Sequence, residues 1–357
     1  MQPENLELNQ IIKSPMNLAL QLAELGKNTV SPNPMVGAVL VQNDRLVGYG
    51  YHLYKGDDHA EIKAIRMAGL SAKNSKLYLN LEPCCHHGLT APCVDQIIKA
   101  GIIEVHFSSL DPNPIVYGKS TQALKQAGIK VFIGQLKEAA EQLNEIFYHY
   151  MKYKKPFVIA KWAMTMDGKI ATANDSQWIT SEKSREHVHT LRNSVDAILI
   201  GSRTAIQDNP ILNVRIDNLV KIRQPLKFII GSDLHALPKD LNIFKINPEK
   251  THLINSDDNF DLNALLIKMA DIGVTSLLIE GGGYTLSKFL QANLIDKFYC
   301  YIAPKFIGGE KSISPFSQDI GVNFIKDAKK AEVKKIELIG EDILIQGNFR
   351  RKKCLPE

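Results

Sequence analysis

The stretch EPCCHHGLTAPC (residues 82–93) is the part of this 357-residue sequence from which fold and chemistry can be worked out. Its Cys84 directly follows a predicted strand, its Cys93 lies in the next predicted helix, and His59 opens the helix before them. One imidazole and two thiolates are the ligand set of a catalytic zinc site that keeps a fourth position open for water. Glu61 cannot easily join the same coordination sphere, but it can reach that water, where a proton shuttle is needed.

A closed structural zinc site is the alternative, because His86 or His87 could supply a fourth protein ligand. The order of the motifs favours catalysis. His-x-Glu opening a helix and Pro-Cys ending a strand are both found in zinc deaminases of nucleobases, where the glutamate is an acid/base. Cys85, His86 and His87 are then loop residues over the site, and we expect them to contact the substrate. A non-enzymatic, zinc-stabilised binding module is a further alternative.

Helix and strand patterns alternate on both sides of this stretch. Predicted helices cover residues 14–25, 59–70, 91–101, 121–129 and 136–153, and predicted strands cover 35–42, 75–81, 103–109 and 130–133, the first returning as a hairpin through 43–48. The alternation predicts a three-layer α/β domain that ends near residue 145.

A boundary follows at Lys154–Lys155–Pro156, after which the alternation starts again. Predicted strands lie within 156–164, 195–201, 226–231, 275–280, 297–309 and 333–349, and predicted helices cover 184–194 and 284–293. We therefore expect a lead-in over residues 1–13 and two α/β domains over 14–150 and 151–357. Two domains also agree with the length, because single hydrophobic cores stop growing at about 250–300 residues.

The composition is that of a globular protein, with 45% hydrophobic and 23% charged residues and a mean hydropathy of −0.12. No stretch approaches the about 18 consecutive apolar residues that a membrane helix needs. The N-terminus MQPENLELNQ is typical of neither a signal nor a transit peptide, so we expect a cytoplasmic protein. The five cysteines do not form a disulfide framework, and we expect Cys300 in a core and Cys354 as a tail thiol.

The net charge of +5 is unevenly distributed. Residues 1–150 carry 13 lysines and arginines against 14 aspartates and glutamates, and the remaining residues carry 30 against 24. Four of the positive charges are Arg350, Arg351, Lys352 and Lys353, a run typical of a solvated chain end. The small surplus that is left suits a phosphorylated small molecule as well as it suits RNA.

Four segments in order give the first half a resemblance to a known family: SPNPMVGAVLV (31–41), GDDHAE (56–61), EPCCHHGLTAPC and DPNPIVYGK (111–119). They resemble the pyrimidine deaminases of riboflavin biosynthesis over most of residues 14–145. Ala91-Pro92 stands where that family usually has two prolines. The resemblance implies a cytidine-deaminase-like α/β/α fold, zinc held by His59, Cys84 and Cys93, and Glu61 as the catalytic acid/base.

In the second half, LLIEGGGYTL (277–286) predicts a buried strand that runs into Gly281–Gly283 and then into a helix. Such a turn presents free backbone N–H groups and the positive end of the helix dipole to a phosphate, although a glycine triplet is also simply a flexible turn. The sequence has no G-x-G-x-x-G fingerprint. Arg192 and Arg215 are candidates for bidentate phosphate binding.

Together with KWAMTMDGKIA (161–171), DSQWITSEKSREHVHTLR (175–192) and DAILIGSRTAIQDNPILNVR (196–215), this segment resembles the reductase domain of the bifunctional riboflavin deaminase/reductases, whose fold is similar to dihydrofolate reductase. The resemblance spans about 156–310. It implies NADPH contacts from Ala163, Trp178, Thr204, Asp208, Ser232, Gly282, Gly283, Tyr284, Thr285, Leu286, Ser287 and Lys288. It implies substrate contacts from Ser176, Arg192, Leu212, Arg215 and Glu280. A core position is the alternative for Trp178.

The resemblance implies two consecutive reactions on one phosphorylated pyrimidine. Zinc-bound hydroxide attacks C2 of 2,5-diamino-6-(5-phosphoribosylamino)pyrimidin-4(3H)-one, with Glu61 moving the proton to the departing amine. NADPH then gives hydride to C1′ of the ribose moiety, which yields the ribitylamino compound. Family members associate through the reductase half, so a homo-oligomer is also implied.

A zinc deaminase of the tRNA-editing type, with an accessory C-terminal domain, is the alternative function. It requires a basic surface near the zinc site, whereas residues 1–150 are slightly acidic and Asp57 and Asp58 precede His59. It also leaves the second domain without a role. We therefore expect a small-molecule substrate, with neither a nucleic acid nor a membrane as partner.

Overall fold

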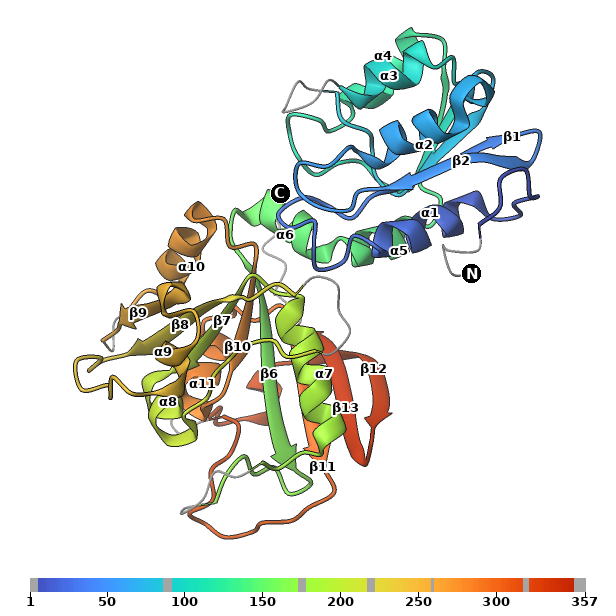
Figure 1. Cartoon of the computed structure of the whole chain (residues 1–357). Coiled ribbons are helices and arrows are strands. Elements are labelled where there is room, and N and C mark those ends of the chain that lie inside the picture. Colours follow the sequence, from blue (N-terminus) through green and yellow to red (C-terminus); the bar gives the residue numbers. More distant parts are fainter. Residues whose placement is uncertain are drawn as a thin grey trace. The chain divides into compact units, whose positions relative to one another are not determined.

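The computed structural model describes residues 6–85, 92–172, 178–216, 222–257, 260–316 and 321–349 (Figure 1). The chain divides into two compact units, Met1–Lys154 and Lys155–Glu357. Both are α/β, as the sequence predicted. None of the described helices has the length and apolar character that crossing a membrane requires. Several residues with expected roles lie outside the described residues: His86, His87, Ser176, Cys354 and the basic run Arg350, Arg351, Lys352 and Lys353.

A five-stranded sheet forms the centre of the first unit. Its strands are β1 (Gly37–Gln42), β2 (Arg45–Tyr51), β3 (Lys76–Leu79), β4 (Glu104–Phe107) and β5 (Lys130–Ile133). They lie in the order β2-β1-β3-β4-β5. β1 pairs antiparallel with β2 and β3, whereas β3, β4 and β5 are parallel. The predicted hairpin is confirmed as β1 and β2.

Helices cover both faces of this sheet and make the three layers (Figure 1). They are α1 (Pro15–Glu24), α2 (Ala60–Ala68), α3 (Cys93–Lys99), α4 (Lys119–Gln126), α5 (Lys137–Leu143) and α6 (Glu145–Tyr153), with a 3-10 turn over Gly69–Ala72. Ala64, Ile97 and Leu124 of α2, α3 and α4 are buried in one core with the sheet. Met16 and Leu22 of α1 are buried in a second core with β1 and β2.

Two glycines of β2 determine how closely α2 lies against the sheet. A Cβ atom on Gly50 would stand 2.3 Å from the backbone oxygen of Ala60, and one on Gly48 would stand 2.3 Å from that of Ala64. No residue with a side chain fits at these distances without a shift of the helix. The absence of side chains at these two positions of β2 therefore sets how closely the N-terminal end of α2 approaches the sheet, and His59 and Glu61 lie at that end.

The single helix predicted over 136–153 is wrong, because the chain breaks at Asn144 into α5 and α6. Asn144 is buried, and its side chain exchanges two hydrogen bonds with the backbone of Met35. Oδ1 accepts from the Met35 N–H at 2.8 Å, and Nδ2 donates to the Met35 carbonyl at 2.9 Å. Asparagine side chains that bond to backbone compete with helix continuation, and this partner is far away in the sequence.

An eight-stranded sheet forms the centre of the second unit. Its strands are β6 (Phe157–Thr165), β7 (Ala197–Gly201), β8 (Leu226–Gly231), β9 (Thr251–Asn255), β10 (Ser276–Glu280), β11 (Lys297–Ala303), β12 (Ala331–Ile339) and β13 (Asp342–Phe349). Their order is β12-β13-β11-β6-β10-β7-β8-β9. The six strands from β11 to β9 in this order are parallel, and the hairpin of β12 and β13 adds an antiparallel end.

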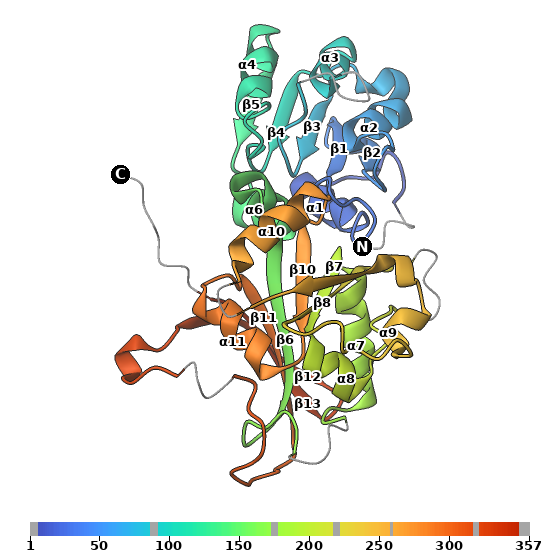
Figure 2. The same cartoon turned by 90° about the vertical axis from the view of Figure 1, so that its left-hand side faces the viewer.

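The helices of the second unit are α7 (Glu182–Asn193), α8 (Ser202–Asp208), α9 (Asn242–Lys245), α10 (Leu262–Asp271) and α11 (Gly283–Gln291), with 3-10 turns over Pro248–Lys250 and Ile325–Asp327. α10 and α11 pack on one face of the sheet, where Leu266 and Phe289 are buried. α7 packs on the other, where Val188 meets Tyr301 and Leu344 (Figure 2). Cys300 is buried in the core, as predicted.

Several elements of this unit differ from the sequence-based expectation. The strand predicted over 297–309 ends at Ala303, because Pro304 cannot donate to the sheet ladder. The sequence analysis missed β9, α8, α9 and α10. For α10 an available signal was overlooked: the carboxylate of Asp261 caps the helix by accepting from the N–H groups of Asn263 and Ala264.

Candidate active sites

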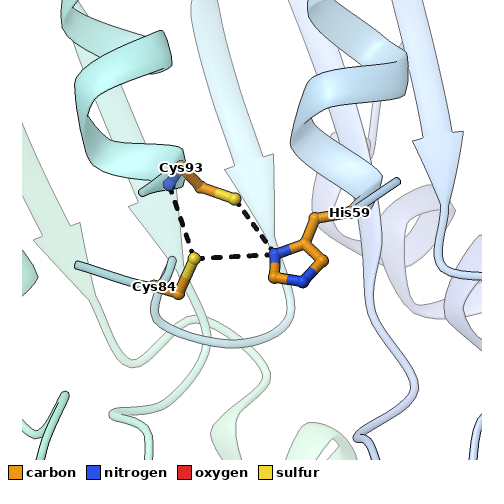
Figure 3. A group of neighbouring side chains, drawn as sticks. All are labelled: His59, Cys84 and Cys93. Carbon is orange, nitrogen blue, oxygen red and sulfur yellow. Dashed lines mark hydrogen bonds between the residues drawn. The ribbon is translucent and has the colours of Figure 1, made fainter. Parts of the chain in front are cut away.

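Three side chains from separate elements meet in the first unit, as Figure 3 shows. His59 is the N-cap of α2, Cys84 lies in the loop after β3, and Cys93 is the first residue of α3. His59 Nδ1 lies 3.1 Å from Cys93 Sγ and 3.5 Å from Cys84 Sγ, and the Cys93 N–H donates to Cys84 Sγ at 3.4 Å. The two helix starts and the strand end thus bring the three predicted ligands together.

The donor set and the spacing fit a zinc ion. The three ligand atoms all lie within 4.8 Å of one another. Two thiolate sulfurs and one imidazole nitrogen suit zinc, and three protein ligands leave a fourth position available. The histidines that could close the site as a structural one, His86 and His87, lie outside the described residues.

The pKa values of the two thiols shift in opposite directions. A hydrogen bond from the Cys93 thiol lowers the pKa of Cys84 to about 4, and the pKa of Cys93 is raised in turn. The hydrogen bond to Cys84 raises the pKa of His59 to about 9. A metal binds deprotonated ligands, so metal binding at this group releases protons.

Glu61 is the second residue of α2, and its side chain is buried, with 3% exposure. Burial raises the pKa of its carboxyl, which also hydrogen-bonds to the Cys93 thiol. A buried carboxyl with a raised pKa, in contact with a ligand but separate from the ligand set, suits a group that takes up and releases a proton.

Two further polar residues border the ligands and were missed by the sequence analysis. The ring of His52 stands edge-on to that of His59, with the centroids 5.6 Å apart. Asn33 Nδ2 lies 3.1 Å from His52 Nε2. Asn33 belongs to the quoted segment SPNPMVGAVLV, which was the available signal. Of the predicted loop residues, Cys85 is half-buried, and its Sγ lies 3.9 Å from the Ile115 carbonyl oxygen.

A bidentate ion pair occupies the centre of the second unit. Arg192, near the end of α7, donates from Nε and Nη2 to the two carboxylate oxygens of Glu280 at 2.6 and 2.8 Å, and from Nη1 to the Asn213 carbonyl at 3.3 Å. Burial alone would raise the pKa of Glu280, but the Arg192 charge outweighs it and the pKa lies below its usual value. The Arg192 guanidinium, which was a candidate for bidentate phosphate binding, thus binds Glu280 instead. The other candidate, Arg215, is exposed.

Lys161 joins this pair and was not singled out from the sequence. It lies on β6 directly beside Glu280 of β10, and burial lowers the pKa of its ammonium group. Its Nζ stands 5.7 Å from the ring centroid of Tyr301. Lys161 therefore shares the site with Arg192 and Glu280, and the carboxylate of Asp208 also acts on its charge.

The glycine triplet lies at the carboxyl end of β10, close to Thr204 in α8, the helix that follows β7. The Gly282 N–H donates to Thr204 Oγ1 at 3.0 Å. Gly281 has a φ of +101°, and a Cβ there would stand 2.7 Å from Thr204 Cγ2. Ligands of parallel α/β sheets bind outside the carboxyl ends of the strands, so the bare backbone here fits a nucleotide phosphate.

The other predicted positions lie on several elements of the second unit. Gly283 to Lys288 form the first turns of α11, where a helix was predicted, and Leu286 is buried in the core. Trp178 is 77% exposed with Arg185 over its ring at 4.4 Å, so the alternative of a core position is wrong. The remaining residues lie on or beside strands and helices: Ala163 in β6, Asp208 at the end of α8, Leu212 buried after it, and Ser232 after β8.

Comparisons with known proteins find a family match for each of the two units. Residues 10–109 match the cytidine and deoxycytidylate deaminase zinc-binding region, and residues 156–345 match the RibD C-terminal domain. The riboflavin biosynthesis protein RibD of Aquifex aeolicus is 39% identical over 95% of this chain and 98% of its own length. That of Escherichia coli is 35% identical over 92% and 96%.

Solved structures give the same result over the whole chain. Acinetobacter baumannii RibD has a TM-score of 0.87 at 33% identity, covering 94% of this chain and 98% of its own. A diaminohydroxyphosphoribosylaminopyrimidine deaminase/5-amino-6-(5-phosphoribosylamino)uracil reductase from Thermotoga maritima has a TM-score of 0.84 at 32% identity, with the same coverage.

A zinc-binding deaminase unit followed by a reductase unit that uses a nicotinamide cofactor defines a bifunctional hydrolase and oxidoreductase. The chain belongs to the RibD family of riboflavin biosynthesis enzymes. The predicted family, fold class and pair of activities are confirmed. The nucleic-acid deaminase with an accessory domain is not favoured, because the second unit is itself a reductase domain of this family.

Proposed function

We propose that the first unit deaminates 2,5-diamino-6-(5-phosphoribosylamino)pyrimidin-4(3H)-one at C2. His59, Cys84 and Cys93 hold zinc, which when bound supplies a water with a pKa lowered to about 7. Glu61 takes a proton from the attacking water and delivers it to the amine that leaves C2 as ammonia. The meeting of the three ligand atoms, with buried Glu61 against one of them, is the observation that carries this proposal.

The second unit then reduces the ribosyl group of 5-amino-6-(5-phosphoribosylamino)uracil to ribityl. NADPH, when bound, supplies the hydride to C1′. Thr204 and the backbone of Gly281 and Gly282 would border its phosphates, and the predicted contacts from Ala163, Trp178, Asp208, Ser232 and residues 283–288 would complete its site. Arg192 holds Glu280 by two hydrogen bonds. These two residues contact the substrate together with Ser176 and Leu212, and exposed Arg215 binds the substrate phosphate.

A sequential assay tests both steps on one sample. Purified protein receives the diaminopyrimidinone ribosyl phosphate, and released ammonia is followed before NADPH is added and its absorbance recorded. We expect ammonia first and NADPH oxidation second. Ammonia without NADPH oxidation would contradict the reductase proposal, and no ammonia from zinc-loaded protein would contradict the deaminase proposal.

Replacing a ligand is expected to separate the two activities. Cys93→Ser exchanges a thiolate ligand for a hydroxyl. Losing only a hydrogen-bond partner of a metal ligand lowers metal affinity by up to about 100-fold, so losing the ligand itself should lower zinc affinity by more. Ammonia release is then lost while NADPH-dependent reduction of the deaminated pyrimidine persists. Metal analysis of the dialysed variant checks this, with Cys300→Ser as the matched control in the other unit. Full zinc occupancy in the Cys93 variant would contradict the ligand assignment.

We propose a small-molecule substrate and no nucleic-acid partner. Residues 1–150 carry slightly more negative than positive charge, whereas proteins that bind nucleic acid rely on basic surfaces. A gel shift with tRNA at low salt should show no complex. A complex that weakens steeply with salt would contradict the proposal.

We also propose that two copies of the chain associate through the second unit. On the sheet face opposite α7, apolar residues line up across three strands: Ile302 of β11, Ile343 and Ile345 of β13, and Ile336 and Leu338 of β12. Ile336 and Leu338 are 65% and 73% exposed. A contiguous apolar face on an edge strand is typical of an interface, and a second copy supplies the same face to cover it.

The double variant Ile336→Lys/Leu338→Lys should therefore be monomeric. Burying two ammonium groups in an apolar interface is unfavourable, so light scattering should give the mass of one chain where the unmodified protein gives that of an oligomer. Leu253→Lys, on the opposite edge strand β9, is the matched control and should leave the mass unchanged. An unmodified protein that is monomeric, or a double variant of unchanged mass, would contradict the proposal.

A further inference from the structure

One buried carboxylate beside the zinc ligands has no part in the mechanism above. Glu82 lies two residues before Cys84, and its side chain is buried. Its Oε2 accepts from the backbone N–H groups of Asp111 and Gly118 at 3.2 and 3.0 Å. Its Oε1 accepts from the N–H and the hydroxyl of Thr121 at 3.3 and 3.5 Å. All four donors come from one segment.

That segment, residues 109–121, leads from β4 into α4 and runs alongside residues 82–85. At its start, the Glu82 N–H donates to the Ser109 carbonyl at 2.9 Å. At its end, the Ser120 hydroxyl donates to the Pro83 carbonyl at 2.5 Å. The contact of Cys85 Sγ with the Ile115 carbonyl lies between them. The segment therefore forms a wall beside the loop that carries Cys84.

Glu82 and the backbone of this wall depend on each other. A buried carboxylate without donors is costly, and buried N–H groups without an acceptor are costly as well. Hydrogen bonds from N–H groups to an ionised carboxylate are roughly twice as strong as neutral ones. The Glu82 side chain thus fixes residues 109–121 against the loop after β3, which carries the proposed zinc ligand Cys84.

We propose that Glu82 is a positioning residue of the deaminase. It holds residues 109–121 at the distance from Cys84 that fits the pyrimidine, and so it contributes to substrate binding without touching the substrate. This inference rests on the deaminase activity proposed above. It goes beyond that activity by assigning a role to a residue that is neither a ligand nor the acid/base.

Glu82→Gln is the informative substitution because it keeps the shape of the side chain. Whichever way the amide is oriented, its NH₂ group replaces an oxygen that accepts two hydrogen bonds, and it then faces N–H donors. We expect the KM for the diaminopyrimidinone ribosyl phosphate to rise, with kcat less affected, and kcat/KM to fall about 10- to 100-fold. Zinc stays at one ion per chain, and reduction of 5-amino-6-(5-phosphoribosylamino)uracil by the same sample is unchanged.

Glu104→Gln on β4, with the same chemical change in a carboxylate paired with Lys76 and His106, is the matched control and should retain the unmodified KM.

Ser120→Ala removes the Pro83 contact and should also raise KM. This variant decides the question if Glu82→Gln does not fold. Unchanged KM in the Glu82 and Ser120 variants would overturn the proposal, as would a loss of zinc that accounts for the whole effect. An unmodified protein that releases no ammonia would instead refute the deaminase activity itself.

Discussion

Glu61→Gln should reduce ammonia release by about 10²- to 10⁴-fold, the range that a positioned acid/base contributes. The glutamine keeps the size of the side chain on α2 but can neither accept a proton from water nor deliver one to the leaving amine. Glu61 is separate from the group of His59, Cys84 and Cys93, so zinc should stay bound. Reduction of the deaminated pyrimidine should be unchanged.

Three measurements on one preparation check this result: zinc per chain, the rate of ammonia release and the rate of NADPH oxidation with the deaminated substrate. Cys93→Ser provides the contrast, because there both metal and deamination are lost. If Glu61→Gln released ammonia at the unmodified rate, another group would be the acid/base. If neither the unmodified nor the variant protein released ammonia while both held zinc, the binding-module alternative would be supported.

Arg192→Met should destabilise the second unit by about 3–5 kcal/mol, the cost of removing one partner from a buried ion pair. Glu280 is 8% exposed, and it would lose both hydrogen bonds from the guanidinium. Lys161 beside it supplies a remaining positive charge, which places the expected effect toward the lower end of that range. Since 1 kcal/mol shifts Tm by about 2–4 °C in a unit of this size, the transition should fall by roughly 10 °C.

The double variant Arg192→Met/Glu280→Leu should recover part of this stability but no reductase activity, because Lys161 stays buried without its carboxylate neighbour. Replacing both members of a buried pair by apolar side chains is often neutral for stability, whereas leaving one charge alone is not. Calorimetry of the whole chain measures both variants, with zinc-dependent ammonia release showing that the first unit is intact. Equal melting temperatures for the single and double variants would show that the Glu280 carboxylate, left without Arg192, is not what destabilises the single variant.

The first site could be predicted from sequence because its signal is local. His59 with Glu61, and Cys84 with Cys93, each lie at a helix start or strand end that short patterns mark. Ligand chemistry then restricts which residue types can serve, so the sequence alone was enough to predict that these three side chains meet. The Gly281–Gly283 turn was predictable for the same reason, since a strand running into bare backbone is a local feature.

The contacts that the sequence did not predict depend on pairing between distant segments. Lys161 reaches Glu280 only because β6 and β10 are parallel neighbours, and no local pattern specifies that register. The break at Asn144 depends on Met35, far earlier in the chain. The role of Glu82 is of the same kind, because its donors lie beyond β4.

The bare surface of β2 has a consequence for how this enzyme can vary. Neither Gly48 nor Gly50 carries a functional group, yet each occupies the space through which α2 approaches the sheet. A single added methyl group on either would push away the helix that carries the proposed zinc ligand His59 and the proposed acid/base Glu61. Deamination therefore limits which residues can replace Gly48 and Gly50, although neither takes part in the reaction. A substitution there would abolish deamination while every reacting group is still present in the sequence.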